Sequence, residues 1–536
     1  MKKVSKRIAL LALTTLVLAS CGAPTLISTP IENIDAIPLK TIPLSEEERK
    51  SWGHADLVSD TIPGMSVDKA YEEFIKGKKG TTVIVGVIDS GVDIEHEDLK
   101  NVVWVNKDER PGNGKDDDNN GYVDDIHGWN FLGDSNDEQL EMTRIVAKGD
   151  DGSEIYKKAK AKLEKELADL QGPKNQLDFI LNVDKTLQNH LKKETYTKEE
   201  VEAIDTEDKE VVQAKQIMLQ ILNGQEMSKA DFDKEIKNFQ DYVYDQLNYN
   251  LNVNFDGRKV VGDDPYNFND KNYGNPNVIG PNKEDAGHGT HVAGIIAAQR
   301  NNNKGIDGVA NNVEIMAIRA VPNGDEYDKD IALAIRYAVD NGAKIINTSF
   351  GKAFSPNAEW VRDAIKYAGE KDVLIVNAAG NDGIDLDDTE NDVFPNDAID
   401  NGPEVSDTFI SVGALANKYG AELVAGFSNY GKQNVDVFAP GSGIYSTTPK
   451  DNYEFKGGTS MAAPAVAGVA ALIRSLYPKL TASQVKQILI DSGLAVKTKV
   501  IVGGKVDDVR SFSELSKSGK MVNAYNALIM AQKMSK

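Results

Sequence analysis

Short apolar and β-branched runs recur along two parts of the chain and alternate with amphipathic stretches. Thr81–Asp89 is a continuous run, and later runs occupy Val313–Ala320, Lys344–Phe350, Val373–Val376, Ile410–Ala414 and Val435–Phe438. Runs without polar alternation are typical of strands buried on both faces of a parallel sheet. Between them, Asp328–Asn341 has the spacing of an amphipathic helix, and Ala358–Gly369 also reads as a helix. The alternation predicts an α/β fold with a doubly wound, mostly parallel sheet and helices on both faces.

A different pattern interrupts this alternation at residues 133–250. This stretch is rich in Lys, Glu, Asp, Gln and Leu, and Thr197 is followed three residues later by Glu200, as in a capping box. We expect several helices here, inserted between the two parts of one α/β domain, residues 51–132 and 251–536. The insertion carries no recognisable chemistry. It is either a lid or partner-binding arm, or a solvated helical excursion.

The N-terminus has the pattern of an export signal. Four basic residues precede an apolar run, Ile8–Ala19, that is too short to span a membrane. The run ends in Leu-Ala-Ser-Cys, which resembles a bacterial lipobox. We therefore expect a lipoprotein signal peptide over 1–20, lipid on Cys21 and a tether over 21–50. An ordinary signal peptide is the alternative. No later stretch reads as long and apolar enough to cross a bilayer.

Lipid on Cys21 implies an exported protein of the cell envelope that touches the membrane through its N-terminal lipid only. Gly-Ala-Pro follows this cysteine without an acidic cluster, so we expect an outer-membrane tether that faces the periplasm. Cys21 is the one cysteine of the 536 residues, which excludes an intrachain disulfide. The net charge of -22 argues against nucleic acid as a partner, because a phosphate backbone requires a basic surface. We expect a monomer.

The stretch Asn113–Trp129 is crowded with oxygen-bearing side chains. Their spacing is close to that of an EF-hand loop, but the flanking helices and the terminal glutamate of an EF-hand are absent. So many carboxylates would repel one another without a cation. We predict a structural Ca²⁺ site, with a solvated acidic turn as the alternative. Its expected ligands are Asp116, Asp118, Asn120, Tyr122 and Asp125.

Three residues far apart in the chain could act together in nucleophilic catalysis. Ser460 lies among small residues, directly before an Ala- and Val-rich stretch that predicts a buried helix. The N-terminus of a helix favours an oxyanion beside it, but a serine hydroxyl is a weak nucleophile without a base. His288 begins another helical stretch, and Asp89 ends a strand-like run. A nucleophile, a base and a carboxylate that orients the base form a serine hydrolase triad.

The segments around these residues closely resemble the signature blocks of the subtilisin-like serine proteases, the subtilases or peptidase family S8. The blocks are VIDSGVD around Asp89, GHGTHVAG around His288 and GTSMAAP around Ser460, in the Asp–His–Ser order of that family. The resemblance runs from about Val83 to Ile488. It implies a serine endopeptidase that hydrolyses polypeptides through an acyl-enzyme intermediate.

The same resemblance implies further site residues. Asn381 matches the asparagine that, with the Ser460 main-chain N–H, holds the oxyanion. Two segments correspond to the walls that pair with an extended substrate and form the pocket for its P1 residue: Ser349, Phe350 and Gly351, and Ala379 and Gly380. His291, one turn after the catalytic histidine, is expected to be structural, since no third ligand for a metal pair is evident nearby.

Other features leave alternatives open. The acidic residues that follow Asn381 could favour basic P1 residues or bind a second cation, or could be a solvated loop: Asp385, Asp387, Asp388, Glu390 and Asp392. The chain before the catalytic core is too short for the family's usual folding-assisting propeptide. Two rival functions are a binding protein that keeps the fold without turnover, and an acyl transferase that excludes water from the acyl-enzyme.

Overall fold

The computed structural model describes residues 29–36, 40 and 42–536. Its main sheet has the strand order β10-β13-β7-β6-β5-β4-β1-β3-β2, and every neighbouring pair except β10 and β13 is parallel. The strands are β1 Val83–Asp89, β2 Gly128–Asn130, β3 Val313–Arg319, β4 Ile345–Thr348, β5 Leu374–Ala378, β6 Phe409–Leu415, β7 Val437–Pro440, β10 Leu494–Ala495 and β13 Lys520–Met521. Each predicted strand is present within a few residues, so the predicted fold class is confirmed.

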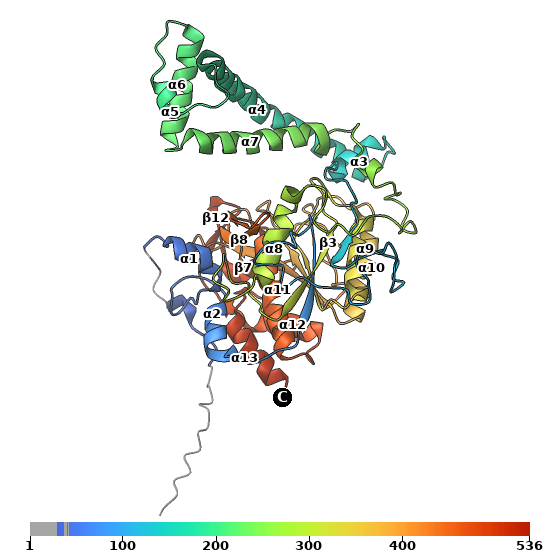
Figure 1. The fold of residues 1–536 in the computed structure, drawn as a ribbon. Helices are drawn as coiled ribbons and strands as arrows, with labels where there is room; N and C mark the ends of the chain where they lie inside the picture. Colours follow the sequence, from blue (N-terminus) through green and yellow to red (C-terminus); the bar gives the residue numbers. More distant parts are fainter. Residues whose placement is uncertain (1–28, 37–39, 41) are drawn as a thin grey trace, which may run out of the picture.

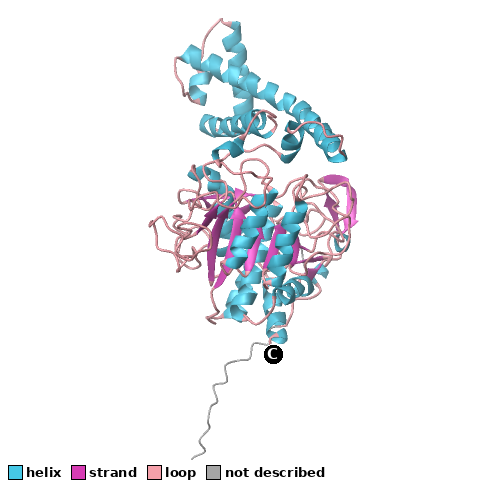
Figure 2. Ribbon diagram, turned by 90° about the vertical axis from the view of Figure 1, so that its right-hand side faces the viewer, coloured by secondary structure: helices cyan, strands magenta, loops and turns pink. Residues whose placement is uncertain are grey.

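Helices cover both faces of the sheet (Figure 2). On one face pack α8 Gly287–Ala297, α11 Thr459–Leu476, α12 Ala482–Ser492 and α13 Ala524–Met534. On the other pack α9 Asp328–Asp340 and α10 Ala358–Glu370. The position of strand β1 explains the apolar run at Thr81–Asp89. Val85 and Val87 pack in the core on the α8 and α11 face of the sheet, and Ile88 packs in the core on the α9 and α10 face. Alternate side chains of a strand point to opposite faces, so a strand covered on both sides is apolar throughout.

Helix α11 corrects one expectation. It has 18 residues and a mean hydropathy of 1.4, which is long and apolar enough to span a membrane. However, 89% of these 18 residues are buried inside the domain, where the helix contacts the central strands. Its apolar character follows from burial on all sides within the core, because a helix surrounded by protein needs no polar face.

Part of the expected tether is folded. Ile34 is 2% exposed and packs in a core with Trp52, whose Nε1 donates to the main-chain oxygen of Gly443 at 3.1 Å. Residues Glu46–Ser51 form helix α1, which begins at a capping box between Ser45 and Glu48. The tether boundary at residue 50 is therefore wrong for the described residues, because buried anchors hold this segment on the domain. Residues 1–28, which include the predicted signal peptide and Cys21, lie outside the described residues.

The remaining elements are short. The N-terminal arm contains η1 Ile34–Ala36, η2 Trp52–His54, α2 Val67–Lys69 and η3 Ala70–Ile75. Two antiparallel hairpins lie outside the main sheet, β8 Ile444–Thr448 with β9 Asn452–Lys456, and β11 Lys499–Val502 with β12 Lys505–Ser511. Single turns are η4 Gln246–Asn250, η5 Gly257–Val260, η6 Lys283–Ala286 and η7 Phe512–Glu514.

The predicted helical insertion corresponds to α3–α7, which stand above the sheet (Figure 1). The helices are α3 Glu141–Ala147, α4 Glu154–Leu191, α5 Lys198–Glu202, α6 Lys209–Gly224 and α7 Lys229–Asp245. The Thr197 capping box is present at the start of α5. Two cores of its own stabilise the insertion, one near the domain around Leu163 and Leu177 and one near the tip around Leu187 and Met218.

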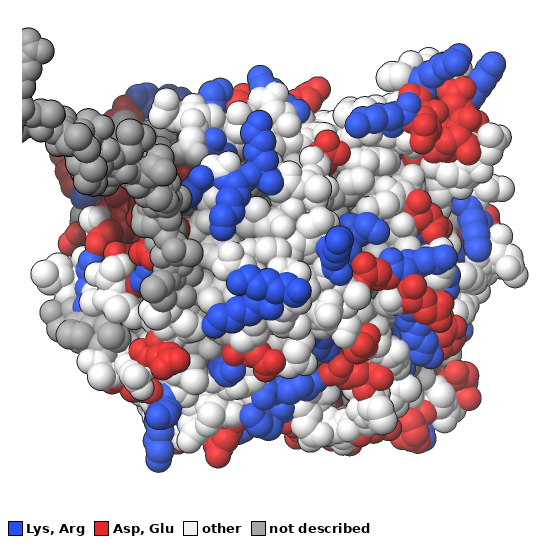
Figure 3. All heavy atoms as spheres, turned by 90° about the horizontal axis from the view of Figure 1, so that it is seen from below, with Lys and Arg blue, Asp and Glu red and all other residues white. Residues whose placement is uncertain are grey.

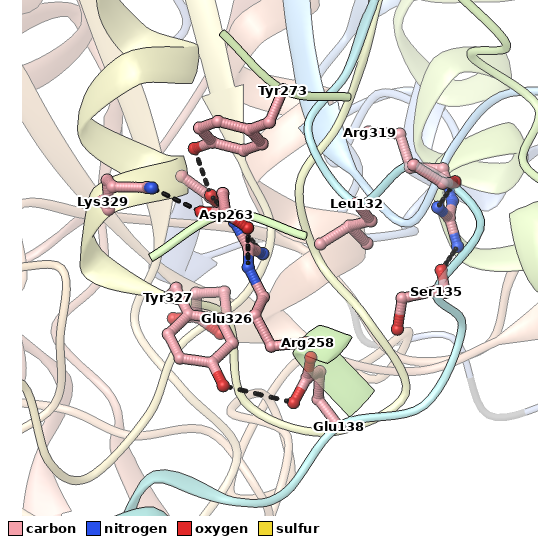
Figure 4. Close-up of polar contacts among 12 residues, drawn as sticks. Leu132, Ser135, Glu138, Arg258, Asp263, Tyr273, Arg319, Glu326, Tyr327 and Lys329 are labelled. Atoms are coloured by element: carbon pink, nitrogen blue, oxygen red, sulfur yellow. Dashed lines mark hydrogen bonds and ion pairs between the residues drawn. The ribbon is translucent and has the colours of Figure 1, made fainter. Parts of the chain in front are cut away.

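Buried ion pairs and a hydrogen bond hold the two ends of the insertion on the domain (Figure 4). On the returning chain, Arg258 pairs with Asp263 at 2.6 Å and with Asp330 of α9 at 2.6 Å, and all three side chains are at most 5% exposed. Lys329 of α9 also pairs with Asp263. On the outgoing chain, Tyr327 donates a hydrogen bond to Glu138 at 3.4 Å. Breaking a buried pair leaves an uncompensated charge, so these contacts fix where the insertion stands.

Candidate active site

Asp89 and His288 meet at the carboxyl-terminal edge of the sheet. Asp89 is the last residue of β1 and is 1% exposed, and its Oδ1 lies 2.7 Å from Nδ1 of His288 in the first turn of α8. The approach requires glycine at 289, since a Cβ there would lie 2.9 Å from the Cβ of Asp89 and 2.2 Å from the Gly91 oxygen. The Gly-His-Gly sequence thus allows α8 to begin against the strand.

This contact sets the charge state of the histidine. Burial lowers the pKa of His288, but attraction to and hydrogen bonding with Asp89 outweigh burial and raise the pKa above its usual value. A carboxylate on Nδ1 also fixes the tautomer that leaves Nε2 free to accept a proton. His288 is 39% exposed, so the ring remains accessible to a substrate.

Ser460 lies in the first turn of α11, which packs against α8. Its Oγ donates to the main-chain oxygen of Ser349 at 3.1 Å, and Oγ of Ser349 donates to the main-chain oxygen of Ser460 at 2.9 Å. Before His288 can deprotonate it, the Ser460 hydroxyl has to give up its hydrogen bond to the Ser349 oxygen. Catalytic hydrogen bonds are often loose before substrate binds, so this arrangement is compatible with a triad.

Two donors converge beside Ser460. Oδ1 of Asn381 accepts hydrogen bonds from the N–H and the hydroxyl of Thr459 at 2.8 and 2.9 Å. The amide therefore turns its Nδ2 the other way. A Cβ built on Gly458 would lie 3.5 Å from this Nδ2 and 3.6 Å from the Ser460 nitrogen. The two nitrogens thus lie close to one point beside Gly458, as two donors to an oxygen that gains negative charge must.

The residues expected to contact substrate lie around one cavity of about 1050 Å³, lined by Ser460, Asn381, Phe350, Gly351 and Gly380. Ser349 and Ala379 lie behind this lining and are 2% exposed. Within this lining, the main chains of Lys352 and Phe394 exchange hydrogen bonds at 2.9 Å. The structure therefore brings together both segments that the sequence assigns to substrate binding.

Sequence reasoning missed Asn429, which shapes the oxyanion side of the cavity. This residue is fully buried, and its Nδ2 donates to the Ala379 oxygen at 3.0 Å. Its Oδ1 accepts from the N–H groups of Asp382 and Ile384 at 3.0 and 3.1 Å. One amide thus holds both sides of the turn that carries Asn381. No local signal marks Asn429, because its partners lie more than 40 residues away.

His291 is placed as a structural residue. The ring is fully buried, and its Nε2 lies 3.1 Å from the main-chain oxygens of both Ile444 and Glu454. Nε2 must therefore carry the proton. Burial lowers the pKa of His291 to about 3, so the ring is neutral and joins α8 to the β8–β9 hairpin.

The acidic residues after Asn381 divide into two groups. Asp385 pairs with Arg510 at 2.8 Å, Asp387 accepts main-chain N–H groups of Gln433 and Asn434, and Asp388 accepts the Glu390 N–H. These three carboxylates serve local structure. Glu390 and Asp392 line the cavity instead. Glu390 and Asp392 are therefore placed to influence a substrate, as is Asp382 directly after Asn381.

The acidic loop brings together a ligand set that differs from the expected one. Carboxylate oxygens of Glu109, Asp118 and Asp125 lie within 4.8 Å of one another. Asp125 is fully buried, and burial raises its pKa to about 6. Asn120 lies beside this cluster: its Nδ2 donates to Asp118 at 3.1 Å and to Asp125 at 3.0 Å, and its Oδ1 accepts the Tyr122 N–H at 2.8 Å. Rotation of this amide would present its oxygen to a cation instead.

Two of the expected ligands have other partners. Asp116 accepts the main-chain N–H groups of Asn120 and Gly121 at 3.0 and 2.9 Å, which shapes the turn. The ring of Tyr122 packs against Trp129 and Tyr337. Glu109 precedes the loop and was missed for that reason. Its Oε2 is buried without a hydrogen-bond partner, on a residue that is 5% exposed.

Comparisons with known proteins point to one family. The profile of the Subtilase family matches residues 80–511. Subtilisin DY of Bacillus licheniformis is 40% identical over 39% of this chain and 70% of its own length. Thermitase of Thermoactinomyces vulgaris is 38% identical over 40% of this chain and 68% of its own.

A third relative, the thermophilic serine proteinase of Bacillus sp. strain AK1, is 41% identical over 41% of this chain. The match covers 48% of that proteinase, so this chain spans about half the length of this relative.

Proposed function

This chain belongs to the subtilase family, and on that premise we propose that it is a serine endopeptidase that hydrolyses peptide bonds in polypeptides. The observation that carries the proposal is the contact at 2.7 Å between buried Asp89 and His288, beside the helix that begins at Ser460. Asn381 adds the second donor for an oxyanion. A binding protein without turnover would not need all four groups in this arrangement.

Each side chain has a defined role in the proposed reaction. His288 takes the proton of Ser460 as the hydroxyl oxygen attacks the substrate carbonyl, and Asp89 stabilises the charged ring. The tetrahedral oxyanion is held by Nδ2 of Asn381 and the main-chain N–H of Ser460. His288 then gives its proton to the leaving amine, and the acyl-enzyme is released by water that the same ring deprotonates.

Calcium is the proposed structural cation of the acidic loop. Its donors would be Glu109, Asp118 and Asp125, with the oxygen of Asn120 after rotation of the amide. An all-oxygen set suits a hard cation, and the unpartnered buried oxygen of Glu109 would gain a ligand bond. The cation would balance three carboxylates whose repulsion otherwise destabilises the loop.

The export and lipid anchoring of the protein are part of the proposal. The described N-terminal segment starts beside α13, where the Ile31 N–H donates to Asn526 at 2.9 Å. This end of the molecule is opposite the insertion (Figure 1). On the face seen from that side, Lys and Arg side chains are interspersed with Asp and Glu (Figure 3). A lipid on Cys21 would therefore direct the catalytic cleft away from an outer-membrane surface.

Labelling with a fluorophosphonate tests the activity. The chain without residues 1–21 is compared with its Ser460→Ala variant, with and without EDTA. Labelling of the first alone supports an activated Ser460, and weaker labelling in EDTA supports the cation. No labelling of a well-folded chain would contradict the proposed activity. Product masses with an added amine would distinguish hydrolysis from acyl transfer.

A further inference from the structure

The first two turns of α4 form a roof over the cavity that starts at Ser460. The floor and walls of this cavity come from the catalytic domain. Its other side is lined by the insertion, through Leu140, Met142, Glu154, Ile155, Lys158, Ala161 and Lys162. The polypeptide segment Phe350–Ser355, which lies on the floor, therefore borders the same cavity as helices that the sequence alone left without a role.

The roof is closed on its far side by one ion pair. Lys158 of α4 lies 3.1 Å from the carboxylate of Glu390, in the loop that follows Asn381. Domain floor, α3, α4 and this loop thus surround the cavity. The two side chains are 62% and 75% exposed. Exposed ion pairs contribute little to stability, so this contact can separate.

The opposite side of the roof is held firmly. Lys352, on the floor, pairs with Glu141 of α3 at 2.8 Å, and Glu141 pairs with Arg144 at 2.6 Å. These side chains are 2% exposed. Phe354 also packs against the insertion core that contains Leu163. The roof is therefore fixed at its base and joined only by a surface contact at its edge.

The dimensions of the cavity restrict what can enter. A volume of 1050 Å³ corresponds to a space roughly 10 Å across, whereas a folded domain of 100 residues has a radius of gyration of about 13 Å. An extended strand rises about 3.3 Å per residue and presents only one chain in cross-section. An extended polypeptide segment therefore fits beneath α4, whereas a whole folded domain does not enter.

We propose that the insertion restricts this protease to extended, unfolded polypeptide that passes between α4 and the Phe350–Ser355 floor. This inference rests on the proposed endopeptidase function and names its substrate class. The Lys158–Glu390 contact closes the passage, so the bound part of a substrate threads beneath it. Folded proteins are cleaved only after they unfold.

A covalent closure of the roof tests the threading. Lys158→Cys and Glu390→Cys are introduced together with Cys21→Ser and joined by a short bismaleimide. Three substrates are compared: a short peptide, a linear unfolded polypeptide, and the same polypeptide cyclised head to tail. Lys165→Cys with Asp169→Cys, an exposed pair within α4 at 3.6 Å, provides the matched cross-linked control.

We expect the closed enzyme to cleave the short peptide and the linear chain. Cleavage of the cyclic chain should fall to the rate that the enzyme molecules without a cross-link account for. The control should cleave all three. Equal cleavage of cyclic and linear chains by the closed enzyme would overturn the proposal. Loss of both, with the short peptide retained, would also overturn it, because the roof would then have to lift for every polypeptide.

Charge reversal gives a second measurement without cross-linking. Lys158→Glu places two carboxylates at the closing contact, and we expect faster cleavage of loops in a folded protein. Adding Glu390→Lys restores the pair and should reverse the gain. Unchanged rates in both variants would contradict the role of this contact. If the parent enzyme cleaves no short peptide and does not react with fluorophosphonate, the proposed function itself fails.

Discussion

Replacement of Lys352 by methionine tests how the insertion is held on the catalytic domain. The Lys352 ammonium contacts Glu141 at 2.8 Å, Asp328 at 2.9 Å and the main-chain oxygen of Glu326 at 2.7 Å. Methionine has a similar length and no charge. The change therefore removes one cation from a buried cluster and leaves the carboxylates in place.

The expected loss of unfolding free energy follows from the lowered pKa of Glu141. Burial raises its pKa, but attraction to Arg144 and Lys352 outweighs burial and lowers the pKa to about 2, from 4.5. At 1.36 kcal/mol per pKa unit, this net shift, after the cost of burial, corresponds to about 3 kcal/mol in favour of the ionised carboxylate. Loss of one partner of a buried pair typically costs 3–5 kcal/mol. We expect Lys352→Met to lower the free energy of unfolding by about 3 kcal/mol.

The assay is urea unfolding at pH 7, followed by tryptophan fluorescence in the Ser460→Ala background to prevent self-cleavage. Lys418→Met is the control, because Lys418 also contacts a carboxylate at 2.8 Å but is 70% exposed. The control should cost under about 1 kcal/mol. The double variant Lys352→Met/Glu141→Gln should lose less free energy of unfolding than the sum of the losses in the two single variants.

The reasoning would be refuted by a loss below about 1 kcal/mol for Lys352→Met, or by additive losses in the double variant. The pH dependence provides another check. Because the pKa of Glu141 is lower in the folded state, its contribution is present above pH 4.5 and is lost as the pH falls towards 2. Glu141→Gln should remove that part of the acid sensitivity.

Three further predictions concern the catalytic and cation sites. Asp89→Asn should lower the pKa of His288, because burial remains while attraction is lost, so the acid limb of kcat/KM moves to lower pH; kcat should fall by on the order of 10⁴. An unshifted limb would contradict this assignment. Asn381→Ala should lower kcat by about 10²–10³, as for one such donor in subtilisin, with little change in KM. A loss of the same size in kcat/KM that arises from KM alone would argue against a role of Asn381 in oxyanion binding. Glu109→Gln should weaken calcium binding in titration calorimetry more than Asp116→Asn does, and equal effects would restore the ligand set expected from sequence.

Some features of the site depend on residues that are neighbours in the chain, and these were predictable. The alternating apolar runs predicted the parallel strands, because burial on both faces requires apolar side chains at every position. The three signature blocks marked Asp89, His288 and Ser460, since each block shapes its own strand end or helix start. Thr197 and Glu200 likewise predicted a helix start, because the two residues of a capping box are only three positions apart.

Other features depend on which distant segments meet. Glu109 and Asn429 carry no local signal, because their partners are brought close only when the chain folds back. The sequence also placed Asp116 among the cation ligands, although its carboxylate is used by nearby main-chain N–H groups.

The sequence by itself determined the sheet, the candidate catalytic residues and the presence of a helical insertion. Only the tertiary structure decided that α4 lies over the cleft and that Lys158 meets Glu390, 232 residues away. A run of charged residues predicts a solvated helix but not its direction from the domain. That direction comes from buried contacts such as Lys352 with Glu141, whose free energy depends on positions in space and not on spacing along the chain.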